Sequence, residues 1–201
     1  AGAYITNTTP TIEFQVKDTD SGVNAGTIAI TVDGTAVSTV TKTAIDGGYK
    51  CTCTSPTLKD GSHTISVKAS DNDGNAAAAK TATFTVDTVP PTLQITAPSN
   101  DLITNKKTVT VSGKTDDVSS KPVTVTVNGA TVTVGTDGTF TKDVTLAEGA
   151  NTITIVAKDK AGKTTTVTRK VTVDTSAPVI KSVTLTPNPV DCGKTFIIAV
   201  E

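Results

Sequence analysis

The residues best suited to chemistry in this chain are aspartates in short glycine-containing segments. Asp71, Asp73 and Asn75 occupy the first, third and fifth positions of a calcium-loop-like segment. Its twelfth position is Ala82, where such a loop needs a bidentate glutamate. The corresponding segment further along the chain, residues 159–163, carries lysines in place of the acceptors, and these cations would repel a divalent ion. The leading aspartate of each segment is therefore interpreted as the cap of a hairpin turn.

Catalysis has few candidate residues. His63 is the single histidine, and glutamate is limited to Glu13, Glu148 and Glu201. No nucleophile elbow and no glycine-rich phosphate loop occurs, and a glycosidase would have to take its two carboxylates from aspartates in turns. We expect no catalytic residues, no cofactor-binding residues and a protein that is not an enzyme. His63 is interpreted as a polar residue where a strand begins.

The composition favours strands over helices. The chain of 201 residues contains 44 Thr, 25 Val and 13 Ile against 5 Leu and no Met, and β-branched residues favour the extended backbone. The formal net charge is −1 and no basic cluster is present, which excludes a nucleic-acid surface. No apolar stretch approaches the length of a membrane span, so we expect no membrane insertion. The missing Met and a strand-like pattern that runs to Glu201 lead us to expect part of a longer protein.

The hydrophobic residues alternate with a period of two, which is the period of a half-buried strand. Residues 11–16, 27–32 and 123–127 show this alternation. Asp33-Gly34 and Asn128-Gly129 stand between such runs and favour tight hairpin turns. About seven short strands in each stretch of about 88 residues predict an all-β fold made of immunoglobulin-like two-sheet sandwiches.

An internal repeat divides the chain. Residues 58–75 align without gaps to residues 146–163, at an offset of 88. Val-Asp-Thr at 86–88 recurs at 173–175, and a proline follows each copy. The first copy carries seven more residues between Gly34 and Leu58. The repeat predicts a first module over 1–88, a second over 89–175 and the start of a third, incomplete module over 176–201.

These residues resemble a known family. The second module, with Leu146, Gly149, residues 151–153 and the Val-Asp-Thr at 173–175, looks like the glucodextranase B-domain type of bacterial immunoglobulin-like module. The first module is similar to related bacterial Ig-like (Big) repeats. The resemblance implies tandem, non-catalytic modules that act as spacers, stalks or adhesive units in surface or phage tail proteins.

A calcium site between modules remains an alternative to a protein without any cofactor. The linker acids Asp87 and Asp174 and the turn acids of the first module could meet at such a junction, as in cadherin-like strings. The candidate metal ligands are Asp18, Asp20, Asp71 and Asp73.

Cysteines and aromatic residues are expected in the core. Cys51 and Cys53 are two residues apart on one strand face, too far apart for an easy disulfide, and should be buried free thiols. Cys192 lies in the incomplete module. Tyr4 is the aromatic residue without an expected core position, so the sequence offers no aromatic platform for a sugar.

Three functions remain open. The leading hypothesis is a structural or adhesion spacer in a larger surface-displayed protein. The alternatives are a phage or prophage tail appendage with weak binding to host-surface glycans, and an accessory domain of a polysaccharide-degrading enzyme. The expected location is the extracellular bacterial cell surface, or a virion in the second case. The expected partners are other modules of the same chain, with cell-surface glycans or a host receptor as candidate ligands.

Overall fold

The chain is folded almost entirely into strands. The computed structural model describes residues 2–182, and no α-helix occurs among them. The strands β1–β8, here called module 1, are β1 (Ala3–Ile5), β2 (Thr11–Lys17), β3 (Ala29–Val32), β4 (Thr35–Ala36), β5 (Thr41–Ile45), β6 (Gly48–Thr54), β7 (Gly61–Lys68) and β8 (Lys80–Val86), with a short 3-10 helix η1 (Ala25–Thr27) before β3.

The second half of the chain repeats this arrangement. Its strands, here called module 2, are β9 (Thr92–Ala97), β10 (Leu102–Thr104), β11 (Thr108–Asp116), β12 (Thr124–Val127), β13 (Ala130–Val132), β14 (Thr139–Thr145), β15 (Gly149–Lys158) and β16 (Thr164–Val173). The all-β prediction is confirmed. The incomplete module predicted over 176–201 lies mostly outside the described residues, and Cys192 lies outside them as well.

Each module is a sandwich of two sheets. In module 1 a sheet of order β1-β8-β7-β3-β4 faces one of order β2-β6-β5. In module 2 the sheets have the orders β10-β16-β15-β12-β13 and β14-β11-β9. Inward side chains of both sheets of module 2 form one core, in which Val111, Val125, Ile153 and Ile155 are fully buried. The core of module 1 is divided into two clusters, and several of its members are only half-buried.

Two hairpins form at the predicted dipeptides. Asp33 and Gly34 have φ values of 50° and 80°, and Asn128 and Gly129 have 48° and 80°. Positive φ at both central residues is the requirement of the tight turn that suits the twist of two paired strands. These turns join β3 to β4 and β12 to β13.

The third strand of the small sheet differs between the modules. In module 1 it is β5, which pairs with β6, and it falls in the segment with seven extra residues. In module 2 it is β9, which pairs with β11 on the opposite side. The counterpart of the β5 pairing in module 2 is a single bridge between Val134 and Phe140. The two copies of the repeat therefore complete the same sandwich in different ways.

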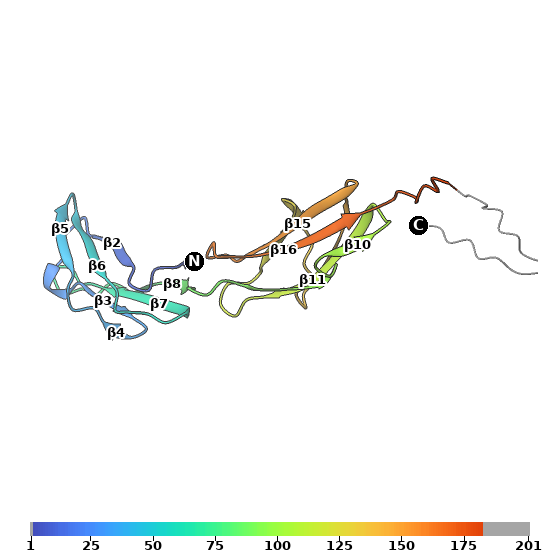
Figure 1. Cartoon of the computed structure of the whole chain (residues 1–201). Coiled ribbons are helices and arrows are strands. Elements are labelled where there is room, and N and C mark those ends of the chain that lie inside the picture. Colours follow the sequence, from blue (N-terminus) through green and yellow to red (C-terminus); the bar gives the residue numbers. More distant parts are fainter. Residues whose placement is uncertain (1, 183–201) are drawn as a thin grey trace, which may run out of the picture.

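The two modules lie end to end (Figure 1). Module 2 begins with β9 at the junction and ends with β16 at its far end, so its two ends are on opposite sides. Module 1 has no counterpart of β9 among the described residues: its first strand, β1, runs parallel to β8 as β10 runs parallel to β16, and the first described residues lie close to the junction. No helix among residues 2–182 is long and apolar enough to cross a membrane.

Candidate metal centre

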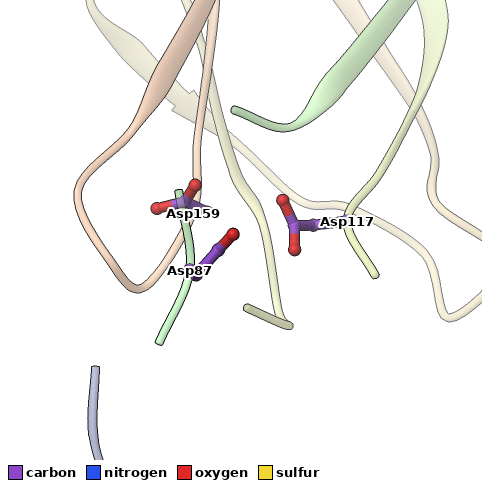
Figure 2. A group of neighbouring side chains, drawn as sticks. All are labelled: Asp87, Asp117 and Asp159. Atoms are coloured by element: carbon purple, nitrogen blue, oxygen red, sulfur yellow. The ribbon is translucent and has the colours of Figure 1, made fainter. Parts of the chain in front are cut away.

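Three aspartates meet where the modules join. Asp87 follows β8 at the end of module 1, Asp117 follows β11, and Asp159 follows β15. One carboxylate oxygen of each lies within 4.8 Å of the others. The exposed fractions are 0% for Asp87, 6% for Asp117 and 5% for Asp159. Figure 2 shows the carboxylates turned toward one another from three separate segments of the chain.

Local hydrogen bonds orient each carboxylate. Oδ1 of Asp87 accepts from the N–H of Val89 at 3.2 Å, and Oδ1 of Asp159 accepts from the N–H of Lys163 at 2.8 Å. Oδ1 of Asp117 accepts from two successive N–H groups, those of residues 119 and 120, at 2.8 and 2.7 Å. Aspartate forms such bonds in turns because its short side chain reaches the backbone a few residues ahead.

The other oxygens of two of these carboxylates have no partner. Oδ2 of Asp87 and Oδ2 of Asp159 are buried and accept no hydrogen bond, and the buried hydroxyl of Ser120 is also unpaired. The ion pairs among the described residues join Lys50 to Glu13, His63 to Asp33 and Lys121 to Asp116, so none of them involves the three aspartates. Buried charges in proteins are normally paired or bound to a metal. The cluster has the donors of a hard-cation site: carboxylate oxygens and no nitrogen or sulfur.

The linker is held against module 2 by specific contacts. Pro91 is fully buried, and the hydroxyl of Thr165 donates to its carbonyl. The hydroxyl of Thr92 donates to the carbonyl of Asp116 at 3.0 Å. Across the junction, the ammonium of Lys160 lies 5.3 Å from the ring centre of Tyr4. These contacts fix the end of module 1 against module 2 and so hold the carboxylates of Asp87 and Asp159 close together.

The metal ligands predicted from the sequence lie elsewhere. Asp18 accepts from the N–H of Gly22 at 2.6 Å, and both oxygens of Asp71 accept from Asn75, at 2.7 Å each. Among the described residues, Asp18, Asp20, Asp71 and Asp73 do not belong to a cluster of three or more acidic, histidine or cysteine side chains. The predicted turn caps are confirmed, because Asp71 and Asp159 each accept from the N–H four residues ahead.

Sequence reasoning named Asp87 as a linker acid but missed its two partners. The lysines after Asp159 argued against a cation there. In the structure Lys160 lies over the ring of Tyr4, away from any ion pair with the aspartates. Asp117 lies outside the segments that align in the repeat, so nothing in the pattern singled it out. One sequence signal for this site was available: the repeat has an aspartate at the same position in both copies, at Asp71 and Asp159 and again at Asp87 and Asp174.

His63 lies near the start of β7, as predicted, and its side chain is buried. Its Nδ1 lies 2.6 Å from Oδ2 of Asp33, and its Nε2 lies 2.8 Å from the carbonyl of Lys59. Only the imidazolium can donate to both. Burial disfavours this charge, but the hydrogen bonds to Asp33 and Lys59 and the attraction of the Asp33 carboxylate outweigh it and raise the pKa of His63. The hydrogen bond to His63 in turn lowers the pKa of Asp33.

Module 1 should lose stability when its histidine is neutralised. Because the pKa of His63 is higher in the folded than in the unfolded state, its protonation stabilises the fold. This contribution to stability is fully present below the unfolded pKa of about 6.5 and is lost as the pH rises through the folded pKa. Asp33 acts oppositely, since its contribution is lost as the pH falls through its lowered pKa. We expect the melting temperature of module 1 to fall by a few degrees between pH 6 and pH 9. Tyrosine fluorescence measures this, because Tyr4 and Tyr49 are both in module 1.

The control for this pH dependence is His63→Asn, which copies the residue at the equivalent Asn151 of module 2. Its melting temperature should be flat over the same interval. A wild-type melting temperature that does not change between pH 6 and pH 9 would show that the ion pair adds nothing to folding.

The cysteines are buried free thiols, as predicted. Cys51 and Cys53 lie on one face of β6 and form no disulfide. Burial raises the pKa of both thiols. Thiolates are the reactive form of cysteine, so neither side chain is suited to nucleophilic chemistry at neutral pH.

Comparison with known families identifies both modules. Residues 2–88 match the family described as bacterial Ig-like domain, and residues 91–175 match domain B of glucodextranase. The chain is therefore a tandem of bacterial immunoglobulin-like modules, and the resemblance seen in the sequence is confirmed. Such domains are typically non-catalytic accessory modules and usually occur in extracellular proteins.

A curated relative and two solved structures show similarity over most of the chain. Bacillopeptidase F of Bacillus subtilis (strain 168) is 32% identical over 155 residues, which are 77% of this chain but only 10% of that protein. A three-domain titin fragment, in a mutated variant, is 12% identical with a TM-score of 0.50, covering 86% of this chain and 62% of the fragment. Fibronectin(III)-like modules of CbhA from Clostridium thermocellum are 19% identical with a TM-score of 0.49, covering 86% and 90%. The titin likeness concerns the fold alone.

Proposed function

We propose that this chain is a non-catalytic spacer that sets the distance and orientation of other domains in a larger extracellular protein. The observation that carries the proposal is the junction. Pro91 is fully buried, its carbonyl accepts from Thr165, and Thr92 is bonded to the loop after β11. A linker fixed in this way transmits the direction of one module to the next, because proline also restricts the backbone.

The chemistry of the described residues supports a role without catalysis. Both nitrogens of the single histidine are engaged by Asp33 and Lys59, and both described thiols are buried. The aromatic rings of Phe84 and Phe140 are buried in the cores, so they offer no stacking surface for a sugar. A general acid or base must come within hydrogen-bond reach of its substrate, and these side chains are buried or bonded within the protein.

Small-angle scattering tests the spacer. The wild-type chain should give an elongated particle with a narrow distribution of maximum dimensions, because the linker is held against module 2. Replacing Val89, Pro90 and Pro91 with glycines should broaden that distribution and shorten its mean, since glycine removes the backbone restriction. A matched control replaces three exposed residues away from the junction, Ala77, Ala78 and Ala79, with glycines. A compact particle with the modules side by side would contradict the spacer and favour a joint binding surface.

A second candidate is an accessory region of a secreted hydrolase. It is favoured by the similarity to Bacillopeptidase F and by the match of residues 91–175 to domain B of glucodextranase. In this version the modules hold a hydrolytic domain at a fixed position. A hydrolase domain on the same gene would support it, a cell-wall sorting signal would support a surface stalk, and neighbouring tail genes would support the virion appendage. Saturable binding on a glycan array, lost in Tyr4→Ala, would also favour the appendage.

A further inference from the structure

We propose that Asp87, Asp117 and Asp159 bind one calcium ion that is shared between the two modules. This inference goes beyond the spacer function, which does not require a metal. It assigns to the junction a ligand whose concentration can control how firmly the two modules are joined. Module 1 supplies one carboxylate and module 2 supplies two (Figure 2).

Burial and missing hydrogen bonds point to a cation. Oδ2 of Asp87 and Oδ2 of Asp159 are buried without a partner, while the Oδ1 atom of each accepts one backbone N–H. An ionised carboxylate loses its water on burial, and like charges at this separation repel each other. A divalent cation at the centre of the three side chains offsets two of their three negative charges and gives the free oxygens a partner.

The size and chemistry of the cluster favour calcium over other metals. Three oxygens no more than 4.8 Å apart can all lie within about 2.8 Å of one point, close to the calcium–oxygen distances of about 2.3–2.6 Å. Magnesium needs a tighter octahedron and gives up its water reluctantly. The common zinc sites include histidine or cysteine beside any carboxylate ligand, and none of the three residues is either. The remaining coordination positions of calcium are filled by water or backbone carbonyls.

A surface hollow borders the cluster on one side. A hollow at the junction is lined by Asp60, Asp87, Val89, Asp117 and Ser119, among others. Two of the proposed ligands thus border an open surface feature while their side chains remain almost fully covered. An access path of this kind is one requirement of a metal site that can load and unload.

The repeat places the same groups at both ends of each module. Asp174 follows the last strand of module 2, as Asp87 follows the last strand of module 1. In each case Oδ1 accepts from the N–H two residues ahead. The N–H of each aspartate donates to the first strand of the large sheet of its own module. Asp18 and Asp71 occupy the loops of module 1 that correspond to those of Asp117 and Asp159. The tail carboxylate of one module and the loop pair of the next together make the site.

The loop pair of module 1 differs in a way that provides an internal control. Both oxygens of Asp71 accept from Asn75, whereas Asp159 keeps one oxygen free because residue 163 is a lysine and supplies only its N–H. Asp71 therefore has no need of a cation. We expect calcium at the Asp87 cluster and not at Asp71.

Calorimetric titration of the whole chain with calcium chloride, after treatment with a chelator, tests the site. The expected result is one tight ion per chain. At about 100 times the dissociation constant, calcium should raise the melting temperature of module 2 by roughly 10–20 °C, and magnesium chloride should act more weakly. Asp87→Asn and Asp159→Asn should each abolish this rise, while Asp71→Asn and Asp174→Asn should retain it. Loss of binding in Asp87→Asn is diagnostic, because Asp87 belongs to module 1.

The effect of Asp159→Asn on the melting temperature without calcium shows whether Asp159 is a metal ligand or only a turn cap. In chelator, Asp159→Asn should melt at the same temperature as the wild type or higher, because asparagine keeps the bond to Lys163 and removes a buried negative charge. In calcium the order should reverse. Equal destabilisation in both conditions would overturn the proposal, as would a wild-type chain whose melting temperature ignores calcium. A chain that stays elongated in chelator would then still act as a spacer, so the two proposals can fail separately.

Discussion

Ile153→Ala is expected to lower the melting temperature of module 2 by roughly 10–25 °C while leaving module 1 almost unchanged. Ile153 is fully buried in the single core of module 2. Truncating such a side chain costs about 2–5 kcal/mol, because burial is lost and a cavity remains. Circular dichroism follows both modules, whereas tyrosine fluorescence follows module 1, which holds both tyrosines. The circular dichroism curve should therefore split into two transitions and the fluorescence curve should not move.

The matched variant is Ile65→Ala, at the equivalent position of module 1. Ile65 is only half-buried against its core, so the expected loss is smaller and should appear in the fluorescence curve. If Ile153→Ala instead shifts both signals together, the modules unfold as one cooperative unit and the junction contributes more to stability than either core.

Gly113→Ala is expected to destabilise module 2 by roughly 2–4 kcal/mol. Gly113 lies where the pairing of β11 with β9 shifts register, and it faces Phe140 on β14. An added Cβ would approach the carbonyl oxygen of Gln94 and come within 2.8 Å of the Phe140 ring. Neither the strand nor the buried ring can move without breaking pairing or opening the core. Urea unfolding followed by circular dichroism measures the loss.

Gly129→Ala is the control for the glycine effect. Gly129 has φ of 80°, but a Cβ there meets nothing within 4 Å, so the cost is the backbone preference of about 1 kcal/mol. If Gly113→Ala costs no more than Gly129→Ala, then β9 can retreat from β11 without loss, and the bulge is not a tight contact.

The sandwich fold could be predicted because its signal is local. Alternating apolar residues, the hairpins at Asp33 and Asn128 and the repeat at an offset of 88 all concern neighbouring positions along the chain. The edges of the sheets were harder. The segment of the first copy that has seven extra residues contains β5, and β9 has no counterpart in module 1 among the described residues. Alternation shows which face of a strand is buried but not which neighbour it pairs with.

The junction could be predicted only in part, because its geometry depends on contacts far apart in the sequence. Asp87 and Asp159 are separated by the whole of β9–β15, and nothing local in either segment indicates the other. The ion pair of His63 was not predicted for the same reason, because its partner Asp33 is 30 residues earlier in the sequence. A lysine beside an aspartate argued against a cation, but side-chain direction decides this, and Lys160 extends to Tyr4.

The division of the junction between the end of one module and the loops of the next has an evolutionary consequence. A gene duplication that copies module 2 copies both its tail aspartate, Asp174, and its loop pair, Asp117 and Asp159, so the joint between two such copies inherits the same three carboxylates without further mutation. The length of such a protein can then change in units of one module while every joint keeps its geometry. The Asp60–Thr88 and Glu148–Thr175 bonds, which fix the chain beside each tail aspartate, show that a substitution of one acid for another is tolerated there. The number of modules, and with it the length of the protein, can therefore change faster than the residues that form each junction.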